Sequence, residues 1–433
     1  MSVINMSVIA IYNKIDTKNP YNHIYKDTKY NSKNCKRHNN NNNNNNNSNN
    51  NNNKFFLKKS LICLISFLLF YNNILFAVAN ANSIDYIQKA DYEQNITIDK
   101  TQNNIPLINI NNSNADGISR NDFLKYNVGS DNLIINNSKE NIETNLGGMI
   151  YGNQNMRGSN GREADIILNE VVGNNITKLE GYTEIAGKKA ELIIANPNGI
   201  YIKGAGFINT SKLNLINGKS INNSINEFDL NSNQNNIGII IEGRDIYKND
   251  NTPLYLNLGL DVSSVDITTI ASKLVKINAK IVGNESNELN IKTGNNKAIR
   301  NNNSYDVNSD DDNSDNNSDV NSDDNDDTTT NNATFAVDSK NFDGMYAGRI
   351  KFVLTENNSG INIENGNIIS NLDNIEINSK GDVIIKNTDN SKTSFDSKND
   401  ISITSNKNMN IDSNSELNSK NDIKVKSSIF KNR

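Results

Sequence analysis

Apolar residues in this 433-residue chain occur in short runs, and this pattern limits the folds that the chain can form. The runs are rich in isoleucine and are separated by asparagine and glycine, a composition that favours short strands. They are Leu133–Ile135, Ile166–Leu168, Leu192–Ile194, Ile237–Ile241, Leu274–Ile277 and Leu289–Ile291. None is long enough to indicate an amphipathic helix. Such sparse apolar residues cannot fill a wide globular core, but they can fill the narrow core of a β-solenoid.

A short repeat near the C-terminus favours the same architecture. The segments Ser379–Ile385, Ser397–Ile403 and Ser419–Val425 each contain a Ser-Lys-x-Asp turn followed by alternating apolar residues. They start 18 and then 22 residues apart, which is close to the length of one solenoid coil. We expect the turn to form a corner and the apolar residues to point inward. Drift within a low-complexity sequence is the alternative origin of the repeat.

Cysteine and histidine, which supply most nucleophiles and metal ligands, occur only in the N-terminal part. Both cysteines, Cys35 and Cys63, and both histidines, His23 and His38, precede residue 82. If that part is removed, disulfides, Cys or Ser-His nucleophiles and an ordinary zinc site are excluded. Residues 82–433 hold 34 basic and 47 acidic residues, a net charge of −13, which is unlike a nucleic-acid binder. We therefore expect no catalytic residues, no metal, no cofactor and no nucleic-acid partner.

The N-terminal part has the three features of a secretory signal peptide. A basic stretch, Lys54–Lys59, precedes the apolar run Leu61–Phe70, and Ala79 and Ala81 occupy the −3 and −1 positions of the expected cleavage site. Cleavage after Ala79 is the alternative. A membrane anchor would need roughly 20 apolar residues, more than this run supplies. We expect export with cleavage of residues 1–81.

Two low-complexity segments interrupt this organisation. Residues 39–53 are asparagine except for one serine, so either the n-region of the signal peptide is unusually long or translation starts downstream. Residues 295–332 include ten aspartates and no lysine or arginine between Asp306 and Asp327. An EF-hand loop needs a central glycine and a terminal glutamate, which this tract lacks. We expect a disordered acidic insertion, with weak cation binding as the alternative.

The most distinct turn in the chain is Asn196-Pro197-Asn198-Gly199, which is followed by Ile200. Proline at the second position fixes φ at about −65°, and asparagine and glycine suit the remaining positions of a type I turn. Apolar runs lie on both sides of it. The turn is either a plain corner between strands or a corner that a partner also recognises.

With these strands and turns in place, residues from Ile105 to about Gly360 resemble the N-terminal two-partner secretion domain of the filamentous hemagglutinin and contact-dependent inhibition family (the hemagglutination activity domain). Single matching stretches are weak, but they follow one another in the order of the family. They are Ile105–Ile110, Gly117–Ser119, Phe123, Asn127–Gly129, Leu146–Gly148, Ile167–Val171, Gly181–Gly187, Ile194–Ile200, Gly206–Thr210, Leu260–Ser263, Ile277–Lys280 and Gly344–Gly348.

The resemblance draws attention to two asparagine turns as candidate transporter-recognition or turn motifs. One is the turn at residues 196–200. The other is Asn153-Gln154-Asn155-Met156, which stands where the family has Asn-Pro-Asn-Leu. Its missing proline argues against a rigid turn there.

The resemblance implies an all-β fold, a right-handed parallel β-helix with hairpins outside the helix. It also implies export to the periplasm of a Gram-negative bacterium and recognition, unfolded or partly folded, by the periplasmic domains of an outer-membrane β-barrel transporter. A disulfide would obstruct threading, and residues 82–433 contain no cysteine. Folding coil by coil outside the cell suits a solenoid.

We therefore expect a secretion domain over residues 82–360 with the insertion at 295–332, followed at 361–433 by the truncated start of β-helix repeats. The expected function is that of a secreted or surface-bound adhesin with a receptor on a host or neighbouring cell. The alternative is the front part of a contact-dependent toxin whose effector is missing. A β-helical polysaccharide-degrading enzyme would need clustered carboxylates on one face, and the repeats place their charges at turns instead.

Overall fold

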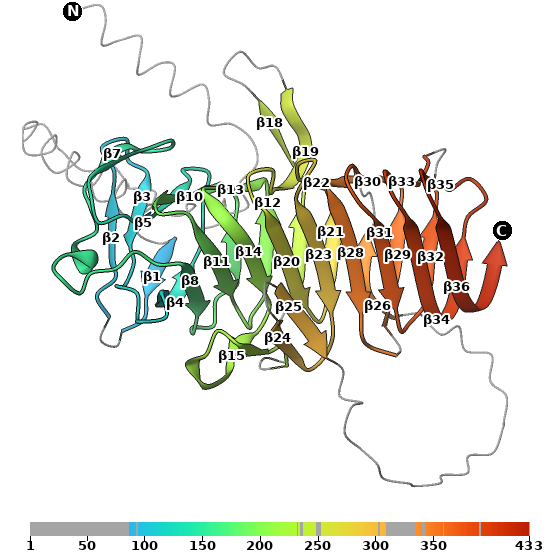
Figure 1. Cartoon of the computed structure of the whole chain (residues 1–433), viewed down its shortest axis with the longest axis horizontal. Helices are drawn as coiled ribbons and strands as arrows, with labels where there is room; N and C mark the ends of the chain where they lie inside the picture. Colours follow the sequence, from blue (N-terminus) through green and yellow to red (C-terminus); the bar gives the residue numbers. More distant parts are fainter. Residues whose placement is uncertain are drawn as a thin grey trace, which may run out of the picture. The chain divides into compact units, whose positions relative to one another are not determined.

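The computed structural model describes residues 86–91, 94–231, 233, 237–247, 253–301, 304–308, 334–339, 343–357, 359–388 and 391–432, and the structural features below are those of these residues. All of them belong to one compact unit, Asn73–Arg433. In Figure 1 the colours of the stacked strands run from blue at one end to red at the other, and the hairpin β18–β19 projects from one side of the stack. The expected signal peptide, including Ala79 and Ala81, lies outside the described residues.

Four sheets contain the strands. The 18-stranded sheet comprises β1 (Ile87–Lys89), β4 (Ile118–Tyr126), β8 (Ile166–Val171), β9 (Thr177–Leu179), β11 (Ala190–Ala195), β12 (Ile200–Lys203), β14 (Thr210–Ile216), β17 (Ile239–Glu242), β20 (Ile267–Ser272), β21 (Val275–Asn278), β23 (Glu288–Thr293), β26 (Thr334–Ser339), β28 (Arg349–Leu354), β29 (Ser359–Glu364), β31 (Ile375–Ser379), β32 (Val383–Lys386), β34 (Ile401–Ile411) and β36 (Ile423–Asn432).

The 12-stranded sheet comprises β2 (Thr97–Lys100), β3 (Pro106–Asn109), β5 (Leu133–Asn137), β10 (Tyr182–Gly187), β13 (Ala205–Ile208), β18 (Arg244–Tyr247), β19 (Pro253–Asp261), β22 (Lys280–Val282), β27 (Met345–Ala347), β30 (Asn367–Ser370), β33 (Ser394–Ser397) and β35 (Glu416–Ser419). A four-stranded sheet contains β15 (Lys219–Ser220), β16 (Glu227–Asp229), β24 (Lys297–Asn301) and β25 (Ser304–Asn308), and β6 (Ile142–Thr144) pairs with β7 (Gly148–Ile150). Two 3₁₀ turns, η1 (Gln154–Met156) and η2 (Ile221–Asn223), complete the described elements.

Each coil contributes one strand to each of three parallel ladders. The coil β10–β11–β12, for example, is followed by β13–β14–β17, and each strand pairs in parallel with its successor. Inward-facing apolar residues stack in register from coil to coil, as in Ile350, Ile375 and Ile401. These ladders form one continuous hydrophobic core along the stack. The fold is the right-handed parallel β-helix with additional hairpins that the family resemblance implies.

The four-stranded sheet covers the outer face of the helix over β8, β11, β14 and β20. A second hydrophobic cluster fills the space between them; its members include Ile193 and Ile216 from the helix wall and Phe228 and Tyr305 from the cover. Strands β24 and β25 pair in an antiparallel hairpin and belong to the segment expected to be a disordered insertion. That expectation is wrong for these two strands, because their apolar residues pack on the wall; residues 309–333 lie outside the described part of the chain.

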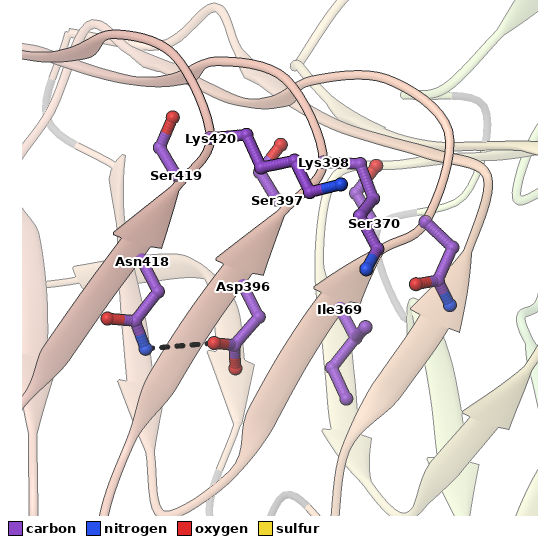
Figure 2. Close-up of a pocket in the computed structure, with 9 residues that line it drawn as sticks. Ile369, Ser370, Asp396, Ser397, Lys398, Asn418, Ser419 and Lys420 are labelled. Carbon is purple, nitrogen blue, oxygen red and sulfur yellow. Dashed lines mark hydrogen bonds between the residues drawn. The ribbon is translucent and has the colours of Figure 1, made fainter.

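The C-terminal repeats form coils without such a cover. Figure 2 shows Ser370, Ser397 and Ser419 at the ends of the neighbouring strands β30, β33 and β35. The hydroxyl of Ser397 donates to the carbonyl of Asp373 in the preceding coil (2.8 Å) and to that of Asp400 in its own turn (3.1 Å). Serine thus ties each turn to its neighbour.

The repeat spacing needs one correction. Ser397 and Ser419 are register partners in adjacent coils, so their separation of 22 residues is one coil. Ser379 instead pairs with Ser405 at a different corner, so the 18-residue step from Ser379 to Ser397 is not a coil. The same turn chemistry recurs at two corners of each coil, and composition alone does not distinguish them. The expected burial of the alternate apolar residues is confirmed for the first two copies, where Val383, Ile385, Ile401 and Ile403 are fully buried. In the third copy Ile423 and Val425 are 45% and 38% exposed.

Candidate functional site

The turn that joins β11 to β12 is built around the buried side chain of Asn196. Its Oδ1 accepts the backbone N–H of Asn198 at 2.9 Å, which closes the turn from inside. Its Nδ2 donates to the carbonyl of Asn175 and to Oγ1 of Thr177, both at 2.9 Å. Every polar atom of this side chain is therefore satisfied within the fold.

The rest of the turn is equally enclosed. The Nδ2 of Asn198 donates to the carbonyl of Gly173 at 2.8 Å, and Asn198 is only 7% exposed. Gly199 adopts φ +117°, and a Cβ there would lie 2.3 Å from Cγ1 of Ile237, so only glycine fits. Pro197 is the partly exposed residue of the turn.

Backbone hydrogen bonds connect this corner to the coils before and after it. The N–H of Thr177 donates to the carbonyl of Gly199 at 3.0 Å, and the N–H of Ile200 donates to the carbonyl of Gly238 at 3.0 Å. The Nδ2 of Asn217, one coil later, donates to the carbonyl of Asn196 at 2.9 Å. The turn is thus an internal corner of the β-helix.

The second asparagine motif has the same construction without proline. Asn153 is the N-cap of η1, and its Oδ1 accepts the N–H of Asn155 at 2.9 Å. The Nδ2 of Asn153 donates to the carbonyls of Ile110 and Asn136, both at 2.9 Å. Met156 is fully buried in the core. The asparagines therefore hold a defined turn here even though the proline is absent.

The two motifs lie at separate corners, and each keeps its asparagine amides inside the fold. Asn155 mirrors Asn198, because its Nδ2 also donates to carbonyls of another segment, those of Asn95 (2.7 Å) and Ile110 (3.0 Å). Of the second motif, Asn153–Met156, only Gln154 is fully solvent-exposed. A partner that meets the folded domain could contact Gln154 and parts of Asn155 and Pro197, whereas Asn153, Asn196 and Asn198 are buried once the coils stack.

The covered wall contains a buried ion pair that the sequence reasoning missed. Glu191 of β11 accepts two hydrogen bonds of 2.6 Å from the guanidinium of Arg300 on β24. Their side chains are 6% and 14% exposed. The ring of Tyr305 lies 5.5 Å from the guanidinium carbon, and its hydroxyl donates to the carbonyl of Ile225. This cluster fastens the hairpin to the helix wall.

A second buried carboxylate lies nearby on the same wall. The side chain of Glu170 is fully buried, and its Oε2 lies 2.6 Å from Nη2 of Arg120. Its other oxygen accepts the N–H of Ser220 at 2.8 Å, and Asp122 also contacts the guanidinium. A signal for such burial exists in the sequence: Leu192-Ile193-Ile194-Ala195 is apolar on both faces, which indicates a strand covered on both sides.

Burial and charge shift the pKa values in the hairpin cluster. Burial of the phenol raises the pKa of Tyr305 to about 12, although the charge of Arg300 opposes this shift. Burial alone would lower the pKa of Arg300, but the hydrogen bonds and charge of Glu191 raise it above its ordinary value. Both groups therefore keep one protonation state across the physiological range, which suits a structural role.

Two further properties concern the described residues alone. No group of three or more His, Cys, Asp or Glu side chains converges there as a metal site would require. Within the same part of the chain, no helix is long and apolar enough to cross a membrane. The expected cleavage residues and most of the acidic tract lie outside this part.

Comparisons with known proteins agree with this geometry. A family model described as the TPS secretion domain matches residues 85–385. The crystal structure of the filamentous hemagglutinin secretion domain has a TM-score of 0.52 and 19% sequence identity, covering 80% of this chain and 99% of that one. At this identity the likeness shows the fold.

Curated relatives match the same region. The 16S rRNA endonuclease CdiA of Enterobacter cloacae subsp. cloacae is 32% identical over 277 residues, which cover 63% of this chain. The tRNA nuclease CdiA-2 of Burkholderia pseudomallei is 31% identical over 265 residues, or 60% of this chain. The chain spans only about 7% of the length of these relatives. With the family model matched across residues 85–385 and the β-helix in place, the chain belongs to the family of proteins that carry a TPS (two-partner secretion) secretion domain.

Proposed function

We propose that this chain directs the export of an adhesin-like exoprotein through a dedicated outer-membrane transporter. The observation that carries the proposal is the secretion-domain match over residues 85–385, on a β-helix that needs no disulfide. The route leads through the periplasm of a Gram-negative bacterium, and the product is secreted or stays at the cell surface. The partner is the transporter, through its periplasmic domains and β-barrel.

The two corner motifs support recognition before folding. In the folded domain Asn153 and Asn196 use their amides for internal hydrogen bonds. A transporter that reads these asparagines must therefore bind the unfolded or partly folded chain, and the same amides then close the corners when the chain stacks. In this proposal each motif acts twice, first as a signal and then as a structural element.

The names of the relatives favour a second candidate. They include nucleases and toxins named CdiA, so this chain is alternatively the front part of a contact-dependent inhibition toxin. The nuclease names belong to proteins of which this chain spans about 7%, and the matched region is a secretion domain. We therefore propose that this domain is non-enzymatic in either case. Both candidates also propose that the exported protein binds a receptor on a target cell.

The test is secretion of the full chain with and without a co-expressed partner transporter. We expect the wild type to reach the medium only with the transporter. The variant Asn196→Ala/Asn198→Ala is compared with Asn217→Ala, which removes an equally buried amide from the same corner one coil later. Loss of secretion in the double variant alone indicates recognition of the motif. Equal losses in both indicate a folding defect, and transporter-independent release contradicts the proposal.

A further inference from the structure

A polar groove lies on the helix beside the covered wall, and none of the residues that line it belongs to either asparagine motif. The segment Asn111–Arg120 forms one side, and the loop Asn222–Asn226 forms the other. The groove has a volume of about 700 Å³, which is enough for a small organic ligand. Neither the export proposal nor the ion-pair clusters assign a role to it.

The loop side of the groove offers free amide groups. The side-chain amides of Asn222, Asn223 and Asn226 make no hydrogen bond within the described part of the chain, and all three residues are exposed. Asn222 and Asn223 adopt positive φ values of 54° and 55°, the left-handed conformation that asparagine accepts more readily than other residues with a side chain. Two consecutive left-handed residues thus shape the rim of the groove.

The remaining lining is polar, apart from a few apolar side chains and one arginine. Ile118 is half-buried and offers apolar surface, whereas Ile225 and Leu168 lie beneath the lining at 8% and 0% exposure. Arg120 also lines the groove, but two carboxylates, Glu170 and Asp122, already bind its guanidinium. Since the cation is more than balanced by these carboxylates, the groove has no surplus positive charge with which to attract an anion.

We propose that this groove binds a neutral saccharide. Side-chain amides both donate and accept hydrogen bonds, as sugar hydroxyls require, and the exposed carboxylate of Asp116 adds an acceptor. The half-buried side chain of Ile118 suits the C–H face of a sugar ring. The inference rests on the proposed adhesin role and names the chemical class of its receptor.

The test measures binding of neutral sugars to the purified full chain. Glucose, galactose, mannose and N-acetylglucosamine are the probes, with glucuronate and sulfated galactose as anionic counterparts, and the readout is saturation-transfer NMR and calorimetry. The key variant is Asn222→Gly/Asn223→Gly, because glycine accepts positive φ and removes only the amides. Asn104→Gly is the matched control, since Asn104 is also exposed with a positive φ of 62° but lies outside the groove.

We expect binding of at least one neutral sugar, about tenfold weaker in the double glycine variant because two hydrogen bonds are lost, and unchanged in Asn104→Gly. Absence of neutral-sugar binding, preference for the anionic sugars, or equal affinity in the double variant would overturn the inference. So would binding of the transporter's periplasmic domain to the groove in place of sugar. Secretion is measured separately, so failure here leaves the export proposal standing.

Discussion

The coils under the four-stranded sheet and the bare coils of the C-terminal repeats share one core but differ in their outer faces. Strand β11 is buried at all six positions, whereas β32 alternates between buried and half-buried residues. Ion pairs follow the same division: Glu191–Arg300 is buried, while Lys392–Glu416 has side chains 64% and 49% exposed. The comparison shows that inward-facing apolar residues are enough to form the coils of the β-helix. Outward-facing apolar residues, as in β11, are what allow a further sheet to pack on the coils.

The largest expected difference concerns the ion pairs. Arg300→Met leaves the carboxylate of Glu191 buried without a cation, so we expect a loss of about 3–5 kcal/mol in the free energy of unfolding. Lys392→Met in the bare coils removes an exposed pair and should cost less than about 1 kcal/mol. Urea unfolding measures both. Similar losses for the two variants would abolish the distinction between the regions, and Glu191→Gln/Arg300→Met should recover part of the loss.

A smaller difference is expected at the corners. Asn196→Ala removes a buried side chain with four hydrogen bonds and leaves the carbonyl of Asn175 with less compensation, so we expect a cost of about 2–3 kcal/mol. Ser397→Ala, at a serine corner of the bare coils, should cost about 1 kcal/mol. The same unfolding experiment ranks them, and a costlier serine variant would reverse the comparison.

Alkaline titration separates the regions spectroscopically. Residues 359–433 contain no tyrosine, so tyrosine absorbance reports on the remainder of the chain. Burial raises the pKa of Tyr305 to about 12 from an ordinary value of 10.0. Because the folded pKa is raised, the stabilisation is complete below pH 10 and disappears as the pH rises through about 12. The difference between wild type and Tyr305→Phe should show this late titration; a step near pH 10 would show that the hairpin is open.

The smallest effect is expected in acid. The carboxylate of Asp306 on β25 is partly desolvated, which opposes ionisation, but its hydrogen bond with Lys292 and the charge of that residue hold its pKa below the ordinary value. A depressed folded pKa stabilises above the unfolded pKa of about 4, and this contribution disappears as the pH falls through the folded value. Since Asp306 is half exposed, we expect its carboxylate to contribute less than about 1 kcal/mol to the free energy of unfolding. Hydrogen exchange of β24 and β25 in wild type and Asp306→Asn measures it, and an acid response that Asp306→Asn retains would exclude this carboxylate.

Local patterns in the sequence predict the strands, the narrow core and the turn at Asn196–Gly199, because each depends on neighbouring residues. They do not predict the cover. Arg300 reaches Glu191 across 109 residues of chain, and no local period specifies such a contact. Aspartates dominate the composition of the insertion, which hid the apolar residues Ala298 and Val307 that pack on the wall. The groove also combines distant segments, so it was not predicted.

The distance in sequence between Glu191 and Arg300 has a consequence for timing. If the chain is delivered to the outside from its N-terminus, Glu191 arrives there 109 residues before its partner. The early coils can stack in the meantime, but Glu191 remains hydrated and the apolar wall around Ile193 remains bare until the hairpin arrives. The stacking of the coils and the packing of the β24–β25 hairpin on their outer face are then separate events. The rate at which the intervening chain is delivered sets the interval between them.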